Sequence, residues 1–165
     1  MQIKRVEIQV IGPETEHQTW SDDLPGQYQS NTLIRIYTDS GVEGIAGVWN
    51  ATSFGYDRYT AESLRHLAPI LIGRDPCDRE SILHDLRPRV FPQPPGALAV
   101  IDIALWDIIG KIQDKPIYQL LGGAMERIPA YASTPTYAAI VTYIPVVAEL
   151  FYQGFQAVKF HTWCI

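Results

Sequence analysis

The sequence has only two cysteines in 165 residues, Cys77 and Cys164. They lie far apart and lack the spacing of metal ligands, so we expect reduced, buried thiols and a cytoplasmic protein. Clusters of lysine and arginine are also missing, and the formal net charge is −5. This charge pattern argues against a nucleic acid or an anionic membrane surface as the partner.

The first residues also lack the basic segment and apolar core of a signal peptide. The first ten residues, MQIKRVEIQV, alternate polar and apolar side chains, which predicts a strand and not a signal peptide. Only residues 128–148 form an uncharged run of transmembrane length, and prolines and threonines interrupt it. We therefore expect a packed strand, loop and helix there and no membrane span.

Near the start of the chain, apolar residues recur with the two-residue period of half-buried strands. Val6, Ile8 and Val10 alternate with polar residues, and Ile34 and Ile36 do the same further on. The sequence TDSG at 38–41 predicts a turn into a third strand at 42–49. Together these segments predict a small antiparallel sheet.

Helices are expected after the sheet. A periodic apolar pattern that ends at Leu67 predicts a helix that stops before Pro69, because proline lacks the backbone N–H that a helix interior needs. Asp75 is then placed to cap a second helix, with Pro76 at its first position.

Residues 97–111 are apolar on nearly every side, which predicts a helix buried among other elements. Asp102, Asp107 and Lys111 are the exceptions. Asp107 and Lys111 are one turn apart and can form an ion pair. We interpret both aspartates as structural and not as a catalytic carboxylate pair.

The pattern changes again towards the end of the chain. IPAYAS at 128–133 predicts a strand, residues 142–152 a helix that ends at Gly154, and residues 156–162 a second strand. Such a βαβ unit has parallel strands and a right-handed crossover. An α+β section is thus followed by the beginning of a parallel α/β section.

The stretch AVIDIALWDIIGKIQDKPIYQLLGG at 99–123 strongly resembles the signature helix of the N-terminal capping domain in the mandelate racemase and muconate lactonizing branch of the enolase superfamily. LAPILIGRDPCD before it and GFQAVKFH at 154–161 extend the resemblance over essentially the whole chain. The resemblance implies an α+β capping domain at 1–127, with a three-stranded antiparallel sheet plus helices. Residues 128–165 would then be the first βαβ unit of an incomplete (β/α)8 barrel.

The resemblance also implies the chemistry of the KFH sequence at 159–161. Enzymes of this branch carry a base at the end of the second barrel strand, where it removes the proton α to a substrate carboxylate. Lys159 takes the electrostatic role and His161 the proton-transfer role. Their two-residue spacing puts both on one strand face, about 6.6 Å apart. Many acid-sugar enzymes of the branch have Lys-x-Lys here, so the histidine leaves the base assignment open.

By the same resemblance, the loops at 12–31 and 50–56 close over the substrate, and Trp20 and Phe54 are the candidate substrate contacts. Ordinary packing of these aromatic side chains is an equal alternative. The residues 12–31 are too many for a simple connection, which also favours a lid or a binding loop.

The implied function is that of a Mg²⁺-dependent acid-sugar dehydratase that forms homo-oligomers and acts on a small-molecule carboxylate. A racemase, epimerase or cycloisomerase of the same superfamily is the alternative, and a non-catalytic capping-domain binding protein is another. The Mg²⁺ ligands of such enzymes come from later barrel strands, so we expect no metal ligands in this chain. A full barrel takes about 250 residues. We therefore expect these 165 residues to be a truncated part that is inactive alone.

Overall fold

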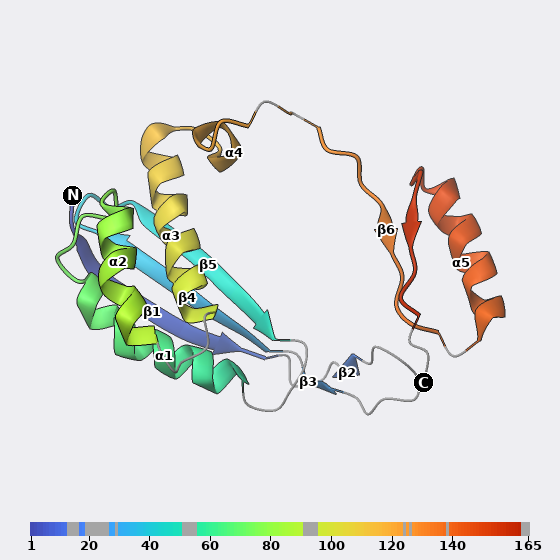
Figure 1. The fold of residues 1–165 in the computed structure, drawn as a ribbon, viewed down its shortest axis with the longest axis horizontal. Coiled ribbons are helices and arrows are strands. Elements are labelled where there is room, and N and C mark those ends of the chain that lie inside the picture. The colour runs from blue at the N-terminus through green and yellow to red at the C-terminus, as the bar shows by residue number, and fades with distance from the viewer. Residues whose placement is uncertain are drawn as a thin grey trace. The chain divides into compact units, whose positions relative to one another are not determined.

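The computed structural model describes residues 1–12, 17–18, 27–28, 30–50, 56–90, 96–123, 125, 127–137 and 139–162. The chain divides into two compact units (Figure 1). Unit 1 comprises Met1–Glu16 and Tyr28–Ala124, and unit 2 comprises His17–Gln27 and Met125–Ile165. The short strands β2 (His17–Gln18) and β3 (Gln27–Tyr28) pair with each other.

Unit 1 contains the predicted antiparallel sheet. Its strands are β1 (Ile3–Ile11), β4 (Ser30–Thr38) and β5 (Glu43–Asn50), in the order β1-β4-β5. In the central strand, Ile34 and Ile36 are fully buried while their neighbours are only partly so. The turn from β4 to β5 is closed by Thr38, whose hydroxyl donates to the Val42 carbonyl at 2.7 Å. The three-stranded sheet is therefore confirmed.

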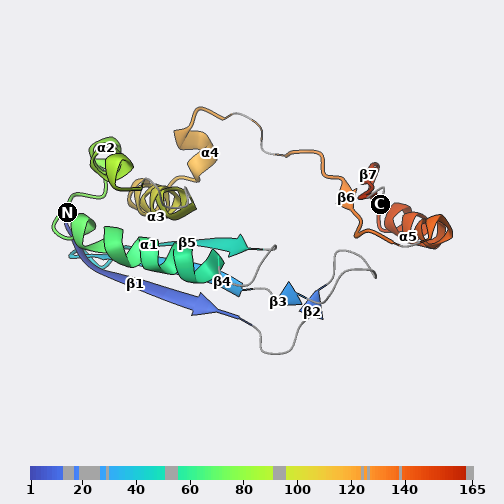
Figure 2. The same ribbon diagram turned by 60° about the horizontal axis from the view of Figure 1, so that its bottom comes forward.

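Helices α1 (Tyr56–Leu71) and α3 (Gly96–Gln113) pack on this sheet, and α2 (Arg79–Val90) packs on these two helices. Helix α1 contacts β1 and β4, and α3 contacts β4 and β5 (Figure 2). A short helix, α4 (Ile117–Leu120), follows α3. The main core is formed by apolar side chains from the sheet and the three helices, among them Ile34, Leu64, Leu86, Ile101 and Leu105.

Helix α3 is buried as its composition predicts, and its aspartates join it to neighbouring elements. Asp102 forms a 2.7 Å ion pair with Arg79 of α2. Asp107 pairs with Lys111 at 2.8 Å and also accepts a hydrogen bond from the backbone N–H of Ile45 at 2.9 Å. Both aspartates therefore have the structural role expected for them.

Sheet and helix approach most closely at Gly44 of β5. A Cβ atom added there would lie 2.2 Å from the Ala104 carbonyl oxygen and 2.6 Å from Cγ1 of Ile108. Both contacts belong to α3. Glycine is required at this position because the backbone of α3 occupies the space that a side chain would need.

Two predicted helix boundaries are wrong. Helix α1 continues through Pro69 to Leu71. The missing N–H of Pro69 costs only one hydrogen bond near the helix end, while Leu71 is fully buried in the core. Asp75 does not cap α2, which begins at Arg79. Its carboxylate instead accepts from the Cys77 backbone N–H at 3.0 Å, in a turn that precedes the helix.

The chain start is tied to two turns of unit 1. The Ile3 N–H donates to the Arg74 carbonyl at 2.9 Å, and the Ile3 carbonyl accepts from the Gly73 N–H at 2.8 Å. Similarly, the Gln2 N–H donates to Oδ1 of Asp39, and the Gln2 carbonyl accepts from the Asp39 N–H, both at 2.9 Å. This N-terminal clasp thus joins the β4–β5 turn to the turn after α1.

Unit 2 contains β6 (Ala132–Ser133), α5 (Ile140–Tyr152) and β7 (Val158–Lys159). The two strands pair in parallel, with Ala132 opposite Val158. Gly154 ends the helix with a φ of +95°, a conformation that favours glycine. The predicted βαβ order is confirmed, although both strands are shorter than predicted. Among the described helices, none is both long and apolar enough to cross a membrane.

Candidate active site

Lys159 and His161 lie at the end of β7, next to β6. The strand pairing includes two bonds of 3.0 Å, in which the Ala132 N–H donates to the Ala157 carbonyl and the Thr134 N–H donates to the Lys159 carbonyl. Lys159 is opposite Ser133 in the register. This pairing brings both candidate residues beside the segment that follows β6.

The imidazole of His161 is held by that segment. Its Nδ1 lies 2.5 Å from the Thr134 carbonyl oxygen and 3.5 Å from the Ser133 hydroxyl. A carbonyl oxygen can only accept, so Nδ1 carries the proton in this contact. The neutral ring then has its lone pair on Nε2, which is the form that a general base requires.

The side chain of Lys159 is exposed. Its Nζ lies 5.8 Å from the centre of the Tyr131 ring, within the range of a cation–π contact. Among the described residues no carboxylate forms an ion pair with this ammonium, so its positive charge can act on an anionic ligand.

Tyr143 of α5 is a further residue of this site, and sequence reasoning did not identify it. Its hydroxyl accepts from the Tyr137 backbone N–H at 3.0 Å and donates to the His161 carbonyl at 2.8 Å. Its ring lies edge-on to the rings of Tyr137 at 4.9 Å and Phe160 at 5.4 Å. The sequence offers one signal for this residue. Tyr143 is a polar aromatic residue in the otherwise apolar segment of α5, eighteen positions before the candidate base.

Trp20 and Phe54 fall outside the described residues. Their proposed contacts with substrate, like the closure of the loops at 12–31 and 50–56, stay predictions.

A magnesium site would need several oxygen ligands, most often carboxylates. In the parts of the chain that the structure describes, no three histidine, cysteine, aspartate or glutamate side chains are close enough to hold a metal ion. The residues around His161 do not fit the ion either, because Nδ1 of the ring is engaged by a carbonyl. The described residues around His161 are therefore not proposed as metal ligands.

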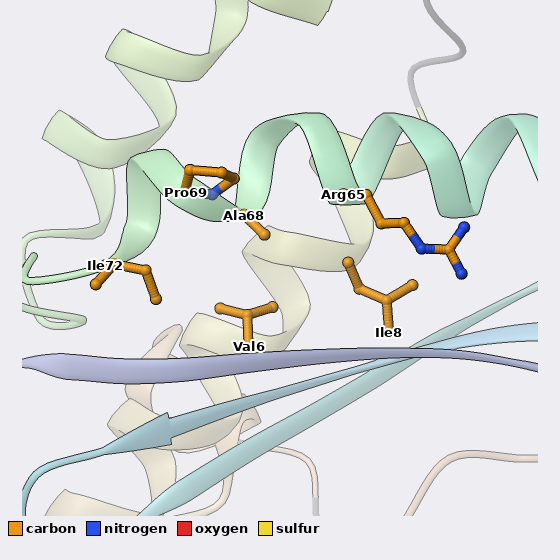
Figure 3. Close-up of a pocket in the computed structure, with 6 residues that line it drawn as sticks. All are labelled: Val6, Ile8, Arg65, Ala68, Pro69 and Ile72. Carbon is orange, nitrogen blue, oxygen red and sulfur yellow. The ribbon is translucent and has the colours of Figure 1, made fainter.

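Concave surfaces among the described residues of unit 1 include the following two. The first, of about 460 Å³, runs between β1 and α1 and is apolar apart from Arg65, whose guanidinium pairs with Glu62. Val6 and Ile8 point from the strand towards the helix in this groove (Figure 3). It carries no group suited to acid–base chemistry, and we interpret it as the open side of the helix–sheet packing.

The second surface, of about 410 Å³, is lined in part by Cys77, Arg79 and Trp106. Cys77 is exposed, so the expectation of a buried thiol is wrong for this residue. The polar turn that Asp75 forms keeps it at the surface. Cys164 lies outside the described residues. Partial desolvation, followed by the charge of Asp75, raises the pKa of the Cys77 thiol, which makes it a poor nucleophile at neutral pH.

Comparison with known proteins agrees with this fold. Residues 24–122 match the family model described as mandelate racemase/muconate lactonizing enzyme, N-terminal domain. A D-galactonate dehydratase family member from Streptomyces bingchenggensis is 38% identical over 132 residues, which cover 76% of this chain and 31% of that protein. The chain therefore corresponds to about a third of the length of this curated relative.

Two solved structures cover nearly the whole chain. A Pseudovibrio sp. protein, assigned to the mandelate racemase/muconate lactonizing enzymes, is 35% identical with a TM-score of 0.89, over 99% of this chain and 44% of its own. D-glucarate dehydratase from Agrobacterium tumefaciens, solved with magnesium, is 27% identical with a TM-score of 0.78, over 99% and 45%. The predicted capping domain with the start of a barrel is thereby confirmed, and the chain belongs to the mandelate racemase/muconate lactonizing enzyme family.

Proposed function

We propose that these residues are the N-terminal part of an acid-sugar dehydratase in which His161 removes the proton α to the substrate carboxylate. Residues 1–127 serve as the capping domain and residues 128–165 begin the barrel. The observation that carries the proposal is the hydrogen bond from His161 Nδ1 to the Thr134 carbonyl, since it leaves the lone pair on Nε2. The names of the dehydratases to which the chain is similar support the substrate class.

The residues at the end of β7 suit the first step of this reaction. Nε2 of His161 takes the α-proton, and the electron pair of the C–H bond moves into the carboxylate to form an enediolate. This places more negative charge on a group that is already anionic, and a fixed cation lowers that cost. Lys159 is the candidate cation, because its ammonium is exposed at the same strand end. The β-hydroxyl then leaves as water with the proton that His161 has taken, and the C–O electron pair goes with it, which gives the enol of a 2-keto acid.

The complete enzyme is proposed to need Mg²⁺, as the magnesium-bound D-glucarate dehydratase suggests. That ion would supply electrostatic stabilisation of the enediolate. Its ligands are expected on later barrel strands and not in these 165 residues, so titration of the 165-residue chain with Mg²⁺ should give no binding heat. The proposed substrate is a small sugar acid, and the proposed assembly of the complete enzyme is a homo-oligomer.

The test begins by sequencing the reading frame beyond codon 165. The complete protein is then incubated in D₂O with a panel of aldonates and aldarates, and proton NMR follows deuterium incorporation at the α-carbon and formation of a 2-keto acid. We expect a 2-keto acid from the complete protein and none from residues 1–165 alone. Epimerised substrate without keto acid would favour the racemase alternative, and turnover by the 165 residues would refute the proposal that they are inactive alone.

Two variants of the complete protein assign the base. His161→Asn should abolish α-proton exchange, whereas Lys159→Met should weaken it and raise KM, because the lost charge affects carboxylate binding as well as the enediolate. Loss of exchange only in Lys159→Met, with exchange retained in His161→Asn, would make Lys159 the base. Tyr152→Phe, at an exposed position of α5, is the matched control.

A further inference from the structure

The hydroxyl of Tyr143 connects three segments of unit 2. Tyr143 is 9% exposed, and its hydroxyl is both an acceptor, for the Tyr137 N–H, and a donor, to the His161 carbonyl. The ring is fixed on two sides by the edge-on rings of Tyr137 and Phe160. A buried hydroxyl with both functions satisfied and its ring packed has little freedom to move.

His161 lies beyond the end of strand β7. The strand ends at Lys159, whose carbonyl accepts from the Thr134 N–H. His161 lies two positions beyond that point. The Tyr143 hydroxyl holds the backbone of His161 from the helix side, and the Thr134 carbonyl holds its ring from the β6 side. The bond to Tyr143 thus ties the residue after the strand to helix α5.

We propose that Tyr143 is a positioning residue that keeps the His161 imidazole on the Thr134 carbonyl and so maintains the Nδ1–H form of the ring. Only the expected effect on catalysis rests on the proposed function, whereas the effect on the His161 ring does not. Without the hydroxyl, the His161 carbonyl loses a donor and the Tyr137 N–H loses an acceptor. The backbone at His161 then loses its tie to α5, and the ring shifts relative to the Thr134 carbonyl.

The deciding experiment needs no substrate. Long-range ¹H–¹⁵N correlation spectra of the ¹⁵N-labelled 165-residue chain report which ring nitrogen of each histidine carries the proton, and His161→Asn identifies the His161 signals among the four histidines. Tyr143→Phe keeps the packed ring and removes only the hydroxyl. We expect the ratio of the Nδ1–H to the Nε2–H form of His161 to fall by about three- to tenfold, the effect of losing about one hydrogen bond.

Tyr152→Phe is the matched control, because Tyr152 ends the same helix and is 88% exposed. It should leave the His161 spectrum unchanged. Amide hydrogen exchange gives a second reading, since the Tyr137 N–H should exchange faster in Tyr143→Phe and not in Tyr152→Phe. An unchanged His161 tautomer ratio in Tyr143→Phe, with the chain still folded, would overturn the proposal.

In the complete enzyme, Tyr143→Phe should lower kcat by about tenfold to a hundredfold, the effect of a shift of about 1 Å in a reacting group. KM should change by less than about twofold, because the Tyr143 hydroxyl contacts the backbone carbonyl of His161 and not its ring. If the unaltered complete protein exchanges no α-proton, the proposed function fails, and the NMR comparison still decides whether Tyr143 positions the ring. A normal kcat in Tyr143→Phe would refute its role in catalysis.

Discussion

The close approach of β5 to α3 at Gly44 gives the sharpest stability prediction. A Cβ at this position would be 2.2 Å from the Ala104 carbonyl oxygen, and that oxygen belongs to a helix backbone that cannot rotate away. To accommodate Gly44→Ala, α3 must move away from the sheet by about 1 Å, a gap that forfeits a quarter to a half of each dispersion contact across it.

The size of the loss follows from what α3 buries. Its buried face includes Val100, Ile101, Leu105 and Ile108. Each such side chain contributes about 2 kcal/mol when fully buried. Gly44→Ala loses part of this contribution and also strains the helix. It should therefore lower the free energy of unfolding by about 3 kcal/mol or more, which is the upper end of the range for overpacked cores. A domain of this size has about 5–15 kcal/mol in total.

Urea denaturation followed by circular dichroism measures this loss, and two other glycines provide graded controls. At Gly47 an added Cβ would be 2.7 Å from Cδ2 of Leu33, the mobile end of a side chain, so Gly47→Ala should cost less. At Gly96 the nearest atom is 4.0 Å away, so Gly96→Ala should be neutral or stabilise α3. Equal effects of Gly44→Ala and Gly96→Ala would refute the reasoning.

Three further predictions concern unit 1. Pro69→Ala should raise the free energy of unfolding by about 1 kcal/mol. The substitution restores a helix hydrogen bond, and this gain outweighs the larger conformational entropy of the unfolded chain that alanine allows. A lower stability in urea would contradict this. The hydrogen bond from Arg74 lowers the pKa of Asp85 in the folded chain. This bond therefore stabilises the fold fully above the ordinary aspartate pKa of about 3.9, and the stabilisation is lost as pH falls through the lower pKa of the folded chain. Urea titrations below pH 4 should therefore show a steeper acid loss in the unaltered chain than in Asp85→Asn, and equal slopes would be evidence against it. Because the pKa of Cys77 is raised, iodoacetamide at pH 8 should alkylate this thiol more slowly in the folded than in the unfolded chain, and Asp75→Asn should speed the reaction of the folded chain. Mass spectrometry of the peptide that contains Cys77 measures both rates. An unchanged rate in Asp75→Asn would exclude the charge of Asp75 as a cause.

The sequence was a good guide to unit 1 wherever a simple period governs the structure. Alternation around Ile34 and Ile36 predicted the sheet, and the apolar residues of 97–111 predicted the buried helix. Local rules failed at Pro69 and Asp75. In the first case core burial at Leu71 outweighed the cost of a proline, and in the second a tight turn used the carboxylate that was expected to cap a helix.

The candidate site was only partly accessible from the sequence. The spacing of Lys159 and His161, together with the family resemblance, indicated the strand end. The contacts that define His161 involve the backbone carbonyl of Thr134 and a tyrosine hydroxyl on another element. Backbone carbonyls are the same in every residue, and contacts across eighteen or twenty-seven positions have no period, so neither partner could be inferred from the pattern.

The N-terminal clasp has a consequence for how the protein is made. Gln2 and Ile3 are synthesised before their hydrogen-bond partners, which are Asp39, Gly73 and Arg74. The start of strand β1 therefore lacks some of its partners until residue 74 has been synthesised. During translation its alternating apolar residues stay exposed, and this interval is when the nascent chain most needs protection from aggregation.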